Sequence, residues 1–303
     1  MPSSAHPRLV LISDVDGTLL DANHQLPWPP AQLRQHIATL ARRIDTTVQL
    51  ALASSRTLRE LVVLQRAIGL PGPCIAEDGA VLAIDDAQSP GPGATLPHDT
   101  ALRPWTSAQY GQRIMHRWHQ SRTATQLRRD FADLPAVARV DAARQSIATQ
   151  HALGFETAGA RRRALVAREH SLLLVPEQLT EHEHHQLRDT ATQRGAQLRR
   201  GGRWLTLAAT EGKGDAVRLL GKLSLTTGVS PVIAVAIGNE ENDVSLLREA
   251  HLRFVIRNPG RGPHPALAAL PQAIVLDTEG PGGWMEMLTR LESLIGPRIT
   301  VSA

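Results

Sequence analysis

The sequence of 303 residues is poor in cysteine and in aromatic residues. Its single cysteine, Cys74, excludes an internal disulfide framework and fits a reducing compartment. Aromatic residues make up only 3% of the chain, which leaves few rings on which nucleic-acid bases could stack. The net charge of +4 is enough to attract a small anionic substrate, so nucleic-acid binding is only a weak alternative.

Long apolar runs are also missing. No stretch approaches the roughly 18 apolar residues of a membrane-spanning helix, and the N-terminal MPSSAHPR has no apolar signal-peptide core. We therefore expect a soluble, cytoplasmic protein that does not bind membranes. Hydrophobic residues reach 42%, which allows a substantial core in one large domain or two modest ones. These features leave the oligomeric state open.

The stretch LVLISDVDGTLL at residues 9–20 combines an apolar run with two carboxylates. The run predicts a strand buried on both faces, and its alternation puts Asp14 and Asp16 on the same side. Buried carboxylates are costly unless a cation or a donor meets them, and Mg²⁺ is the natural partner where phosphate is the substrate. One carboxylate could attack phosphorus while the other moves protons. An ordinary turn is the alternative for a bare D-x-D-G.

The elements before residue 85 alternate between strand and helix. Strands are predicted at 48–53 and 74–76, and helical spacing of apolar residues runs over 33–44 and again from residue 58. Alternation returns after residue 212. This order is typical of an α/β fold, a doubly wound parallel sheet with helices on both faces.

The region between these halves has a mixed pattern, and we interpret it as an inserted α+β cap domain. We therefore predict a discontinuous core over 1–85 and 209–303, with the cap at 86–208. The cap's predicted elements are a helix through Ile114 and Trp118, strands at 171–175 and 203–207, and a polar helix at 181–193.

Three later residues could complete a phosphate site at the carboxyl ends of the strands. Ser54 follows the strand 48–53, where its hydroxyl could hold a phosphate oxygen; a helix N-cap is the alternative. Lys213 lies between two glycines in a chain with only two lysines, which indicates a need for a compact ammonium charge. A surface lysine is the alternative there. Asp243 ends the segment GNEEND after a predicted strand at 232–237, where further oxygen ligands belong.

These residues follow the four-motif order of the haloacid dehalogenase superfamily of phosphatases, and the insertion resembles that of its Cof-like subclass. Shorter segments are similar to the mannosyl-3-phosphoglycerate phosphatase family. They are SSRT at 54–57, IAEDGA at 75–80, REHS at 168–171, GGRW at 201–204 and GPGGW at 280–284.

The resemblance implies a Mg²⁺-dependent phosphatase that works through an aspartyl-phosphate. In that scheme Asp14 attacks phosphorus, and Asp16 protonates the leaving group and then activates water. Ser54 and Lys213 hold the phosphoryl oxygens. The best single substrate is mannosyl-3-phosphoglycerate.

The resemblance also implies two sets of binding residues. The metal ligands would be Asp14, Asp16, Asn239 and Asp243. The substrate would be bound by Ser55, Arg56, Arg168, Glu169, Ser171 and Arg203. Asn239 stands where the superfamily usually has Asp, so weaker cation binding is expected.

Two other interpretations stay open. A phosphatase of the same subclass could act on sucrose phosphate or another sugar phosphate, because such enzymes share the core and differ in the cap. A protein that only binds a phosphorylated ligand is the second, since Asn239 removes one charge from the expected metal site.

Overall fold

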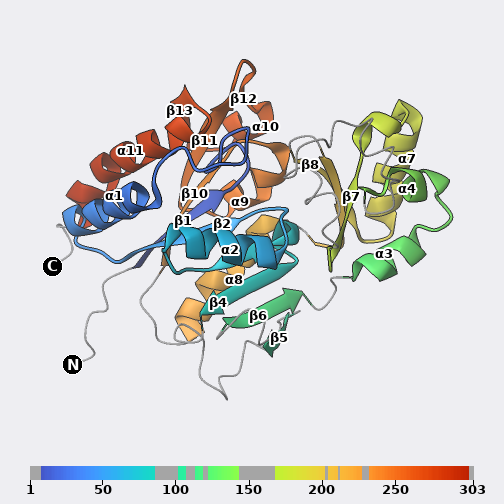
Figure 1. Ribbon diagram of the computed structural model, residues 1–303, viewed down its shortest axis with the longest axis horizontal. Coiled ribbons are helices and arrows are strands. Elements are labelled where there is room, and N and C mark those ends of the chain that lie inside the picture. The colour runs from blue at the N-terminus through green and yellow to red at the C-terminus, as the bar shows by residue number, and fades with distance from the viewer. Residues whose placement is uncertain are drawn as a thin grey trace.

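The computed structural model describes residues 8–85, 102–106, 113–118, 122–142, 168–201, 204–210, 212–226 and 232–299. A ten-stranded sheet lies at the centre of the larger unit (Figure 1). Its strands are β1 (Arg8–Asp14), β2 (Val48–Ala53), β3 (Cys74–Ala76), β4 (Val81–Asp85), β5 (Leu102–Thr106), β6 (Arg113–Trp118), β10 (Val232–Gly238), β11 (Leu252–Asn258), β12 (Gly262–Pro263) and β13 (Ala273–Glu279).

The strand order is β12-β11-β10-β1-β2-β3-β4-β6-β5, with β13 also paired to β11. The central strands β11, β10, β1, β2 and β3 run parallel, as does β13. The outer strands β12, β4, β6 and β5 join antiparallel. Because parallel strands end at the same edge, the loops after β1, β2 and β10 meet at one place.

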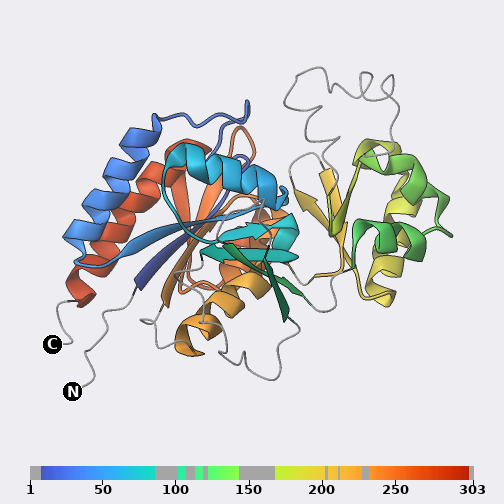
Figure 2. The ribbon, with the colours of Figure 1, turned by 60° about the horizontal axis from the view of Figure 1, so that its bottom comes forward.

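Helices cover both faces of this sheet (Figure 2). One face packs against α1 (Pro30–Arg43), α2 (Leu58–Ile68) and α11 (Pro281–Ile299). The other packs against α8 (Lys213–Thr226), α9 (Val244–Arg248) and α10 (Pro265–Ala268). The predicted α/β class is confirmed.

Strand β1 divides its apolar residues between the two layers. Leu9 and Leu11 belong to the core under α1, α2 and α11, whereas Val10 and Ile12 belong to the core under α8 and α9. All four are at most 1% exposed. This alternation explains why the sequence shows a continuous apolar run, as expected of a strand with parallel neighbours on both sides.

A second unit lies beside the core, at the right of Figure 1. It contains the antiparallel sheet β7-β9-β8 and a hydrophobic cluster separate from those of the core. Its elements are α3 (Ala124–Asp130), α4 (Pro135–Val140), β7 (Ser171–Leu174), the short 3-10 turn η5 (Pro176–Gln178), α7 (Glu181–Gln193), β8 (Gln197–Gly201) and β9 (Trp204–Ala208). We propose that this unit is the cap.

Strands β5 and β6 lie within residues 86–208, the range assigned to the cap from sequence, but both belong to the core sheet. The predicted helix through Ile114 and Trp118 is wrong, because these residues form β6, which pairs with β4 and β5. A spacing of four residues suits a strand of period two as well as a helix, and strand pairing decided between them. The core sheet therefore extends past the predicted boundary at residue 86.

Candidate active site

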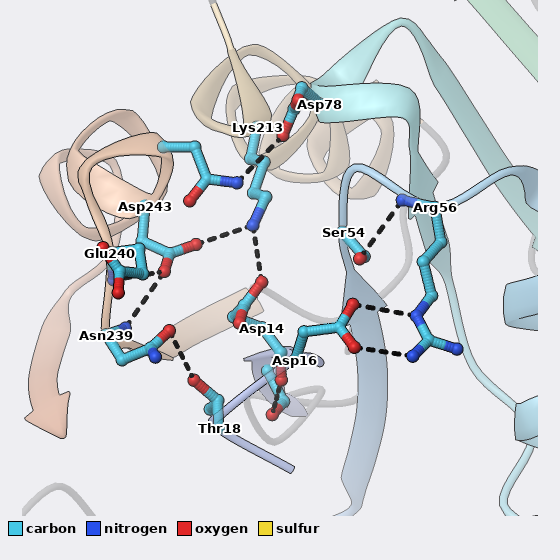
Figure 3. A network of polar contacts seen from close by, with 12 residues as sticks. Asp14, Asp16, Thr18, Ser54, Arg56, Asp78, Lys213, Asn239, Glu240 and Asp243 are labelled. Atoms are coloured by element: carbon cyan, nitrogen blue, oxygen red, sulfur yellow. Dashed lines mark hydrogen bonds and ion pairs between the residues drawn. The ribbon is translucent and has the colours of Figure 1, made fainter. Parts of the chain in front are cut away.

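A buried ion triad connects three segments, the carboxyl end of β1, the start of α8 and the loop after β10 (Figure 3). Lys213 Nζ lies 2.6 Å from Asp14 Oδ1 and 2.7 Å from Asp243 Oδ1. Lys213 and Asp243 are fully buried and Asp14 is 5% exposed. One ammonium thus faces two carboxylates, and the triad carries one excess negative charge when all three groups are ionised.

This excess charge appears in the pKa values of the triad. Burial raises the pKa of Asp14 to about 7, and the charge of Asp243 adds to the rise while Lys213 opposes it. Burial alone would lower the pKa of Lys213, but the charges of Asp14 and Asp243 raise it. The lysine therefore stays charged, and the ionised form of Asp14 would be stabilised by a further positive group.

The loop after β10 fixes Asp243 through its backbone. Asp243 Oδ2 accepts hydrogen bonds from the amides of Asn239, at 3.0 Å, and Glu240, at 3.1 Å. A Cβ on Gly238 would lie 2.6 Å from Asp243 Cβ, so only glycine fits at the end of β10. The loop includes the 3-10 turn η6 (Glu241–Asp243).

Asn239 connects this loop to the loop after β1. Its Oδ1 accepts a hydrogen bond from Thr18 Oγ1 at 3.2 Å, and its Nδ2 donates to Asn258 Oδ1 at 2.8 Å. Asn258 Nδ2 in turn donates to the Asn239 carbonyl oxygen at 3.0 Å. Gly17 has φ +78°, and a Cβ there would come within 2.7 Å of Asn239 Nδ2. The amide of Asn239 is therefore matched to both neighbours.

The donor set here fits a hard divalent cation. Asp14, Asp243 and Asn239 supply side-chain oxygens near the carboxyl ends of β1 and β10, and such oxygens are what Mg²⁺ prefers. Within the described ranges, no three His, Cys, Asp or Glu side chains form a metal group.

Asp16 points toward the loop after β2 and away from the triad (Figure 3). Arg56 binds both of its oxygens, with Nε 2.9 Å from Oδ2 and Nη2 2.6 Å from Oδ1. His24 Nδ1 lies 2.8 Å from Asp16 Oδ1. Arg56 was expected to bind the substrate, and in the structure its guanidinium binds Asp16. His24 was not predicted, because a lone histidine in a polar loop carries no sequence signal.

Ser54 lies at the end of β2 and is 1% exposed. Its Oγ accepts a hydrogen bond from the Arg56 amide at 3.2 Å, which leaves the hydroxyl proton free to point elsewhere. The alternative that Ser54 is a helix N-cap is wrong: α2 is capped by Thr57, whose side chain forms a reciprocal capping box with Glu60.

The predicted substrate-binding residues of the cap lie next to the core. Arg168 Nε donates to the backbone oxygen of Ser55 at 3.2 Å. The amide of Glu169 and the hydroxyl of Ser171 both donate to Glu77 in the core. Ser171 is 1% exposed, so its hydroxyl serves the protein's own structure. Arg203 lies outside the described residues.

A further contact that sequence analysis missed supports the backbone of Asp14. Trp284 Nε1 donates to Ser13 Oγ at 3.0 Å, and Ser13 Oγ donates to the Asp14 carbonyl oxygen at 2.6 Å. The Trp284 side chain is fully buried. Its indole nitrogen also ties α11 to the end of β1.

Comparison with known proteins finds a family that part of this arrangement resembles. Residues 11–90, which carry Asp14, Asp16, Ser54 and Arg56, match the haloacid dehalogenase-like hydrolase family. Over this range the chain is similar to haloacid dehalogenase-like hydrolases. The matched range holds Asp14 and the Asp16–Arg56 pair, whereas Lys213 and Asp243 of the triad lie outside it.

Solved structures share this fold over nearly the whole chain. Protein 0175 from Thermoplasma acidophilum has a TM-score of 0.59 at 17% identity, covering 95% of this chain and 99% of that one. A haloacid dehalogenase-like hydrolase from Bacteroides thetaiotaomicron has a TM-score of 0.56 at 14% identity, covering 94% and 99%. The sucrose-phosphatase of Synechocystis sp. PCC6803, solved with sucrose and phosphate, has a TM-score of 0.52 at 18% identity, covering 94% and 98%.

At these identities the structural matches support the fold and say nothing of the substrate. In the described part of the chain, no helix is long and apolar enough to cross a membrane.

Proposed function

We propose that this hydrolase is a Mg²⁺-dependent phosphatase of a phosphorylated sugar compound, with mannosyl-3-phosphoglycerate as the best single substrate. The observation that supports it most is the buried triad of Asp14, Lys213 and Asp243 at the edge of a parallel sheet. A buried carboxylate with excess negative charge beside it is costly to the fold, and nucleophilic chemistry is a reason to keep it.

The first chemical step forms a bond between Asp14 and phosphorus while the bond to the leaving oxygen breaks. Asp16, oriented by Arg56 and His24, supplies a proton to that oxygen. Asp16 then takes a proton from water as the water attacks phosphorus. The bond between Asp14 and phosphorus breaks, which restores the Asp14 carboxylate and releases inorganic phosphate. Lys213 stabilises the phosphoryl oxygens, because its ammonium already lies against Asp14.

A bound Mg²⁺ would supply positive charge that offsets the negative charge of the phosphoryl group. The residues that would hold it are Asp14, Asp243, Asn239 and the backbone carbonyl of Asp16. The Ser54 hydroxyl supplies one further donor to the phosphoryl oxygens at the end of β2.

The cap segment 168–171 is the part that we expect to recognise the leaving group. Arg168 lies against the backbone of Ser55, beside the loop that carries Ser54 and Arg56. A guanidinium there suits a carboxylate such as that of a glycerate, which it can bind with two hydrogen bonds. Sucrose phosphate or another sugar phosphate is the alternative substrate of the same site.

Phosphate release tests the proposal directly. The protein is assayed with Mg²⁺ against mannosyl-3-phosphoglycerate, sucrose phosphate, other sugar phosphates and p-nitrophenyl phosphate. Asp14→Asn should abolish release while the protein stays folded, and beryllium fluoride should attach at Asp14 alone. Turnover above a few per cent in Asp14→Asn would show that another residue is the nucleophile.

A second variant, at Arg168, tests whether the cap recognises the leaving group. Arg168→Ala should lose activity on the glycerate-bearing substrate and keep it on p-nitrophenyl phosphate, which offers no carboxylate to the guanidinium. Equal losses on both substrates would mean that Arg168 only supports the structure through Ser55.

A protein that binds a phosphorylated ligand without hydrolysing it is the second candidate, and Asn239 is the observation that favours it. An amide in place of a carboxylate lowers the charge available to a cation. No phosphate release at any Mg²⁺ concentration, together with retained binding of a sugar phosphate, would support this second candidate.

A further inference from the structure

Glu77 is a buried core carboxylate whose hydrogen bonds go to the cap. Its Oε1 accepts the amide of Glu169 at 2.9 Å, and its Oε2 accepts the amide of His170 at 2.8 Å and the hydroxyl of Ser171 at 2.9 Å. Glu77 is 2% exposed, and His170 and Ser171 are each 1% exposed. One carboxylate thus accepts three hydrogen bonds from three consecutive residues of the other unit.

The turn that carries Glu77 has an unusual backbone. Within η1 (Glu77–Gly79), Glu77 has φ +48° and Asp78 has φ +55°, both in the left-handed region, and Gly79 follows with φ +93°. Left-handed conformations are unfavourable for residues with a Cβ and persist where their surroundings fix them. A Cβ on Gly79 would lie 2.2 Å from the Gly212 carbonyl oxygen, so this turn packs directly against the start of α8.

The same turn is bonded to the loop after β2. The Glu77 amide donates to the Arg56 carbonyl oxygen at 2.9 Å, and the Asp78 amide donates to the Ser54 carbonyl oxygen at 3.1 Å. These two bonds hold the loop that presents Ser54 and the guanidinium of Arg56. The backbone of Glu77 therefore supports the phosphate site while its side chain holds the cap.

Asp78 extends the connection to the remaining parts of the site. Its Oδ1 accepts a hydrogen bond from Asn242 Nδ2 at 3.2 Å, next to Asp243, and its carbonyl oxygen accepts one from Thr210 Oγ1 at 3.2 Å. A turn of three residues thus contacts the loops after β2 and β10, the start of α8 and the cap.

In the cap, the segment 169–171 that binds Glu77 is connected both to the core and to the rest of the cap. Arg168 precedes it and donates to the Ser55 carbonyl oxygen, and the Glu169 carbonyl oxygen accepts the Ala124 amide at 2.8 Å at the start of α3. Ser171 begins β7, one of the two edge strands of the cap sheet. Fixing 169–171 therefore fixes both the position of Arg168 and the docking of the cap sheet.

We propose that Glu77 is a positioning residue for substrate specificity: its carboxylate holds the cap segment 168–171 in register with the phosphoryl site. Burial raises the pKa of Glu77, while the two backbone amides, the charge of Arg168 and the Ser171 hydroxyl oppose that rise. These donors face the carboxylate in the place of water. The inference rests on the proposed phosphatase function, and it adds the residue that aligns leaving-group recognition with phosphoryl transfer.

Glu77→Gln tests it, because the carboxamide keeps one acceptor oxygen but turns an NH₂ group toward a hydrogen-bond donor. Glu183→Gln is the matched control: Glu183 Oε2 accepts a backbone amide and a hydroxyl from Thr180, at 2.9 Å and 3.0 Å, in α7 of the same unit. Glu183 lies in the N-terminal turn of that helix and has no contact with the segment 168–171 among those described.

Two measurements are made on each variant. The first is the ratio of kcat/KM for mannosyl-3-phosphoglycerate to that for p-nitrophenyl phosphate, with Mg²⁺ present. Glu77→Gln should lower this ratio by about tenfold or more, since hydrogen bonds to a charged acceptor are lost. The second is hydrogen exchange of the Glu169 and His170 amides, which should become about tenfold faster. Glu183→Gln should change neither and should speed exchange only at Thr180.

The two readouts separate the possible outcomes. Equal losses on both substrates, or unchanged exchange at Glu169 and His170, would overturn the positioning role while leaving the phosphatase function intact. If the wild type hydrolyses no ester, the proposed function is wrong and the exchange experiment alone decides whether Glu77 fixes the segment. If Glu77→Gln fails to fold, Ser171→Ala removes one of the three donors and should change both readouts in the same direction by a smaller amount.

Discussion

The guanidinium of Arg56 holds the carboxylate of Asp16 with two hydrogen bonds, of 2.9 Å from Nε and 2.6 Å from Nη2. The Arg56 side chain is 12% exposed and that of Asp16 is 35% exposed. Burial would lower the pKa of Arg56, but the hydrogen bond and the charge of Asp16 raise it. Asp16, the residue proposed to move protons, is therefore oriented by the guanidinium of Arg56 from the loop after β2.

Arg56→Lys should separate this orienting role from charge alone. Lysine keeps the positive charge but cannot bind both oxygens of Asp16 in the plane of the carboxylate. We expect kcat to fall by about ten- to a hundredfold with a smaller change in KM, since misplacing a reacting group slows the step that it serves. Steady-state kinetics on p-nitrophenyl phosphate measures this.

The control for that variant is Arg43→Lys. Arg43 Nη1 also contacts both oxygens of a carboxylate, Glu292, but the pair lies on the surface between α1 and α11. It should leave kcat unchanged. An Arg56→Lys enzyme with wild-type kcat would mean that Asp16 needs only a nearby positive charge.

Lys213→Met should destabilise the fold as well as abolish activity. Removing the ammonium leaves Asp14 and Asp243 buried and unpaired, a change that typically costs about 3–5 kcal/mol. Urea unfolding at pH 8 measures the loss. The control is Lys222→Met, the only other lysine of the chain, which is exposed on α8 and should have a smaller effect. A Lys213→Met protein as stable as the wild type would show that the triad is relaxed by water or by protonation.

Asp14 should make the metal-free protein less stable as the pH rises. Its pKa is about 7 in the folded protein and 3.8 ordinarily, so between these values the unfolded chain has lost a proton that the folded protein keeps. The stabilisation from Asp14 is therefore complete below about pH 4 and is lost as the pH rises through about 7.

Asp14→Asn lacks this titration, so its stability relative to wild type should rise across the same pH window. The rise should be on the order of 4 kcal/mol at most, since each pKa unit corresponds to about 1.4 kcal/mol. Urea unfolding at several pH values, with a chelator present, measures it. Asp277→Asn, at an exposed carboxylate on β13, is the control and should show no such slope. A flat difference between pH 4 and pH 8 for Asp14→Asn would contradict the raised pKa.

Much of the fold could be predicted from sequence because local and global signals agree in many of its elements. The strands at 48–53 and 74–76 have the predicted bounds, and the helix predicted at 181–193 is α7. Buried parallel strands give continuous apolar runs, which are easy to recognise. The strand β6 was wrongly predicted as a helix, because the spacing of its apolar residues fits both a helix and a strand. Only its antiparallel pairing with β4 and β5 distinguishes the two.

Residues of the candidate site could be predicted where the residue type itself implies the chemistry. They could not be predicted where the role of a side chain depends on which distant residue it bonds to. Asp14, Lys213 and Asp243 meet as expected, because motifs at the ends of parallel strands converge. The pairing of Arg56 with Asp16 depends on side-chain direction across two loops, which a one-dimensional pattern does not contain. Glu77 lies in the segment IAEDGA at 75–80, but the three groups that donate hydrogen bonds to it lie 92 to 94 residues further along the chain.

Asn239 is held as an amide by its surroundings. Its Nδ2 donates to Asn258 Oδ1, so an aspartate at this position would put two acceptor oxygens against each other. Asn258 cannot simply turn over, because its own Nδ2 donates to the Asn239 carbonyl oxygen. Without metal, Asn239→Asp should therefore lower the free energy of unfolding by about 1–3 kcal/mol, the usual cost of an unsatisfied buried polar group.

With Mg²⁺ present, the same substitution should act in the opposite direction. Asn239→Asp adds a full negative charge beside Asp14 and Asp243, and one charge at short range is worth a few kcal/mol at an effective dielectric constant of about 20, before desolvation offsets part of it. The Mg²⁺ concentration for half-maximal phosphate release should fall by about one to two orders of magnitude. Asn242→Asp is the matched control, because it adds the same charge in the same loop, but its side chain contacts Asp78. It should not tighten Mg²⁺ activation. An unchanged midpoint in Asn239→Asp would show that Asn239 does not bind the cation, whereas a wild type that gains activity only through this substitution would favour the ligand-binding protein.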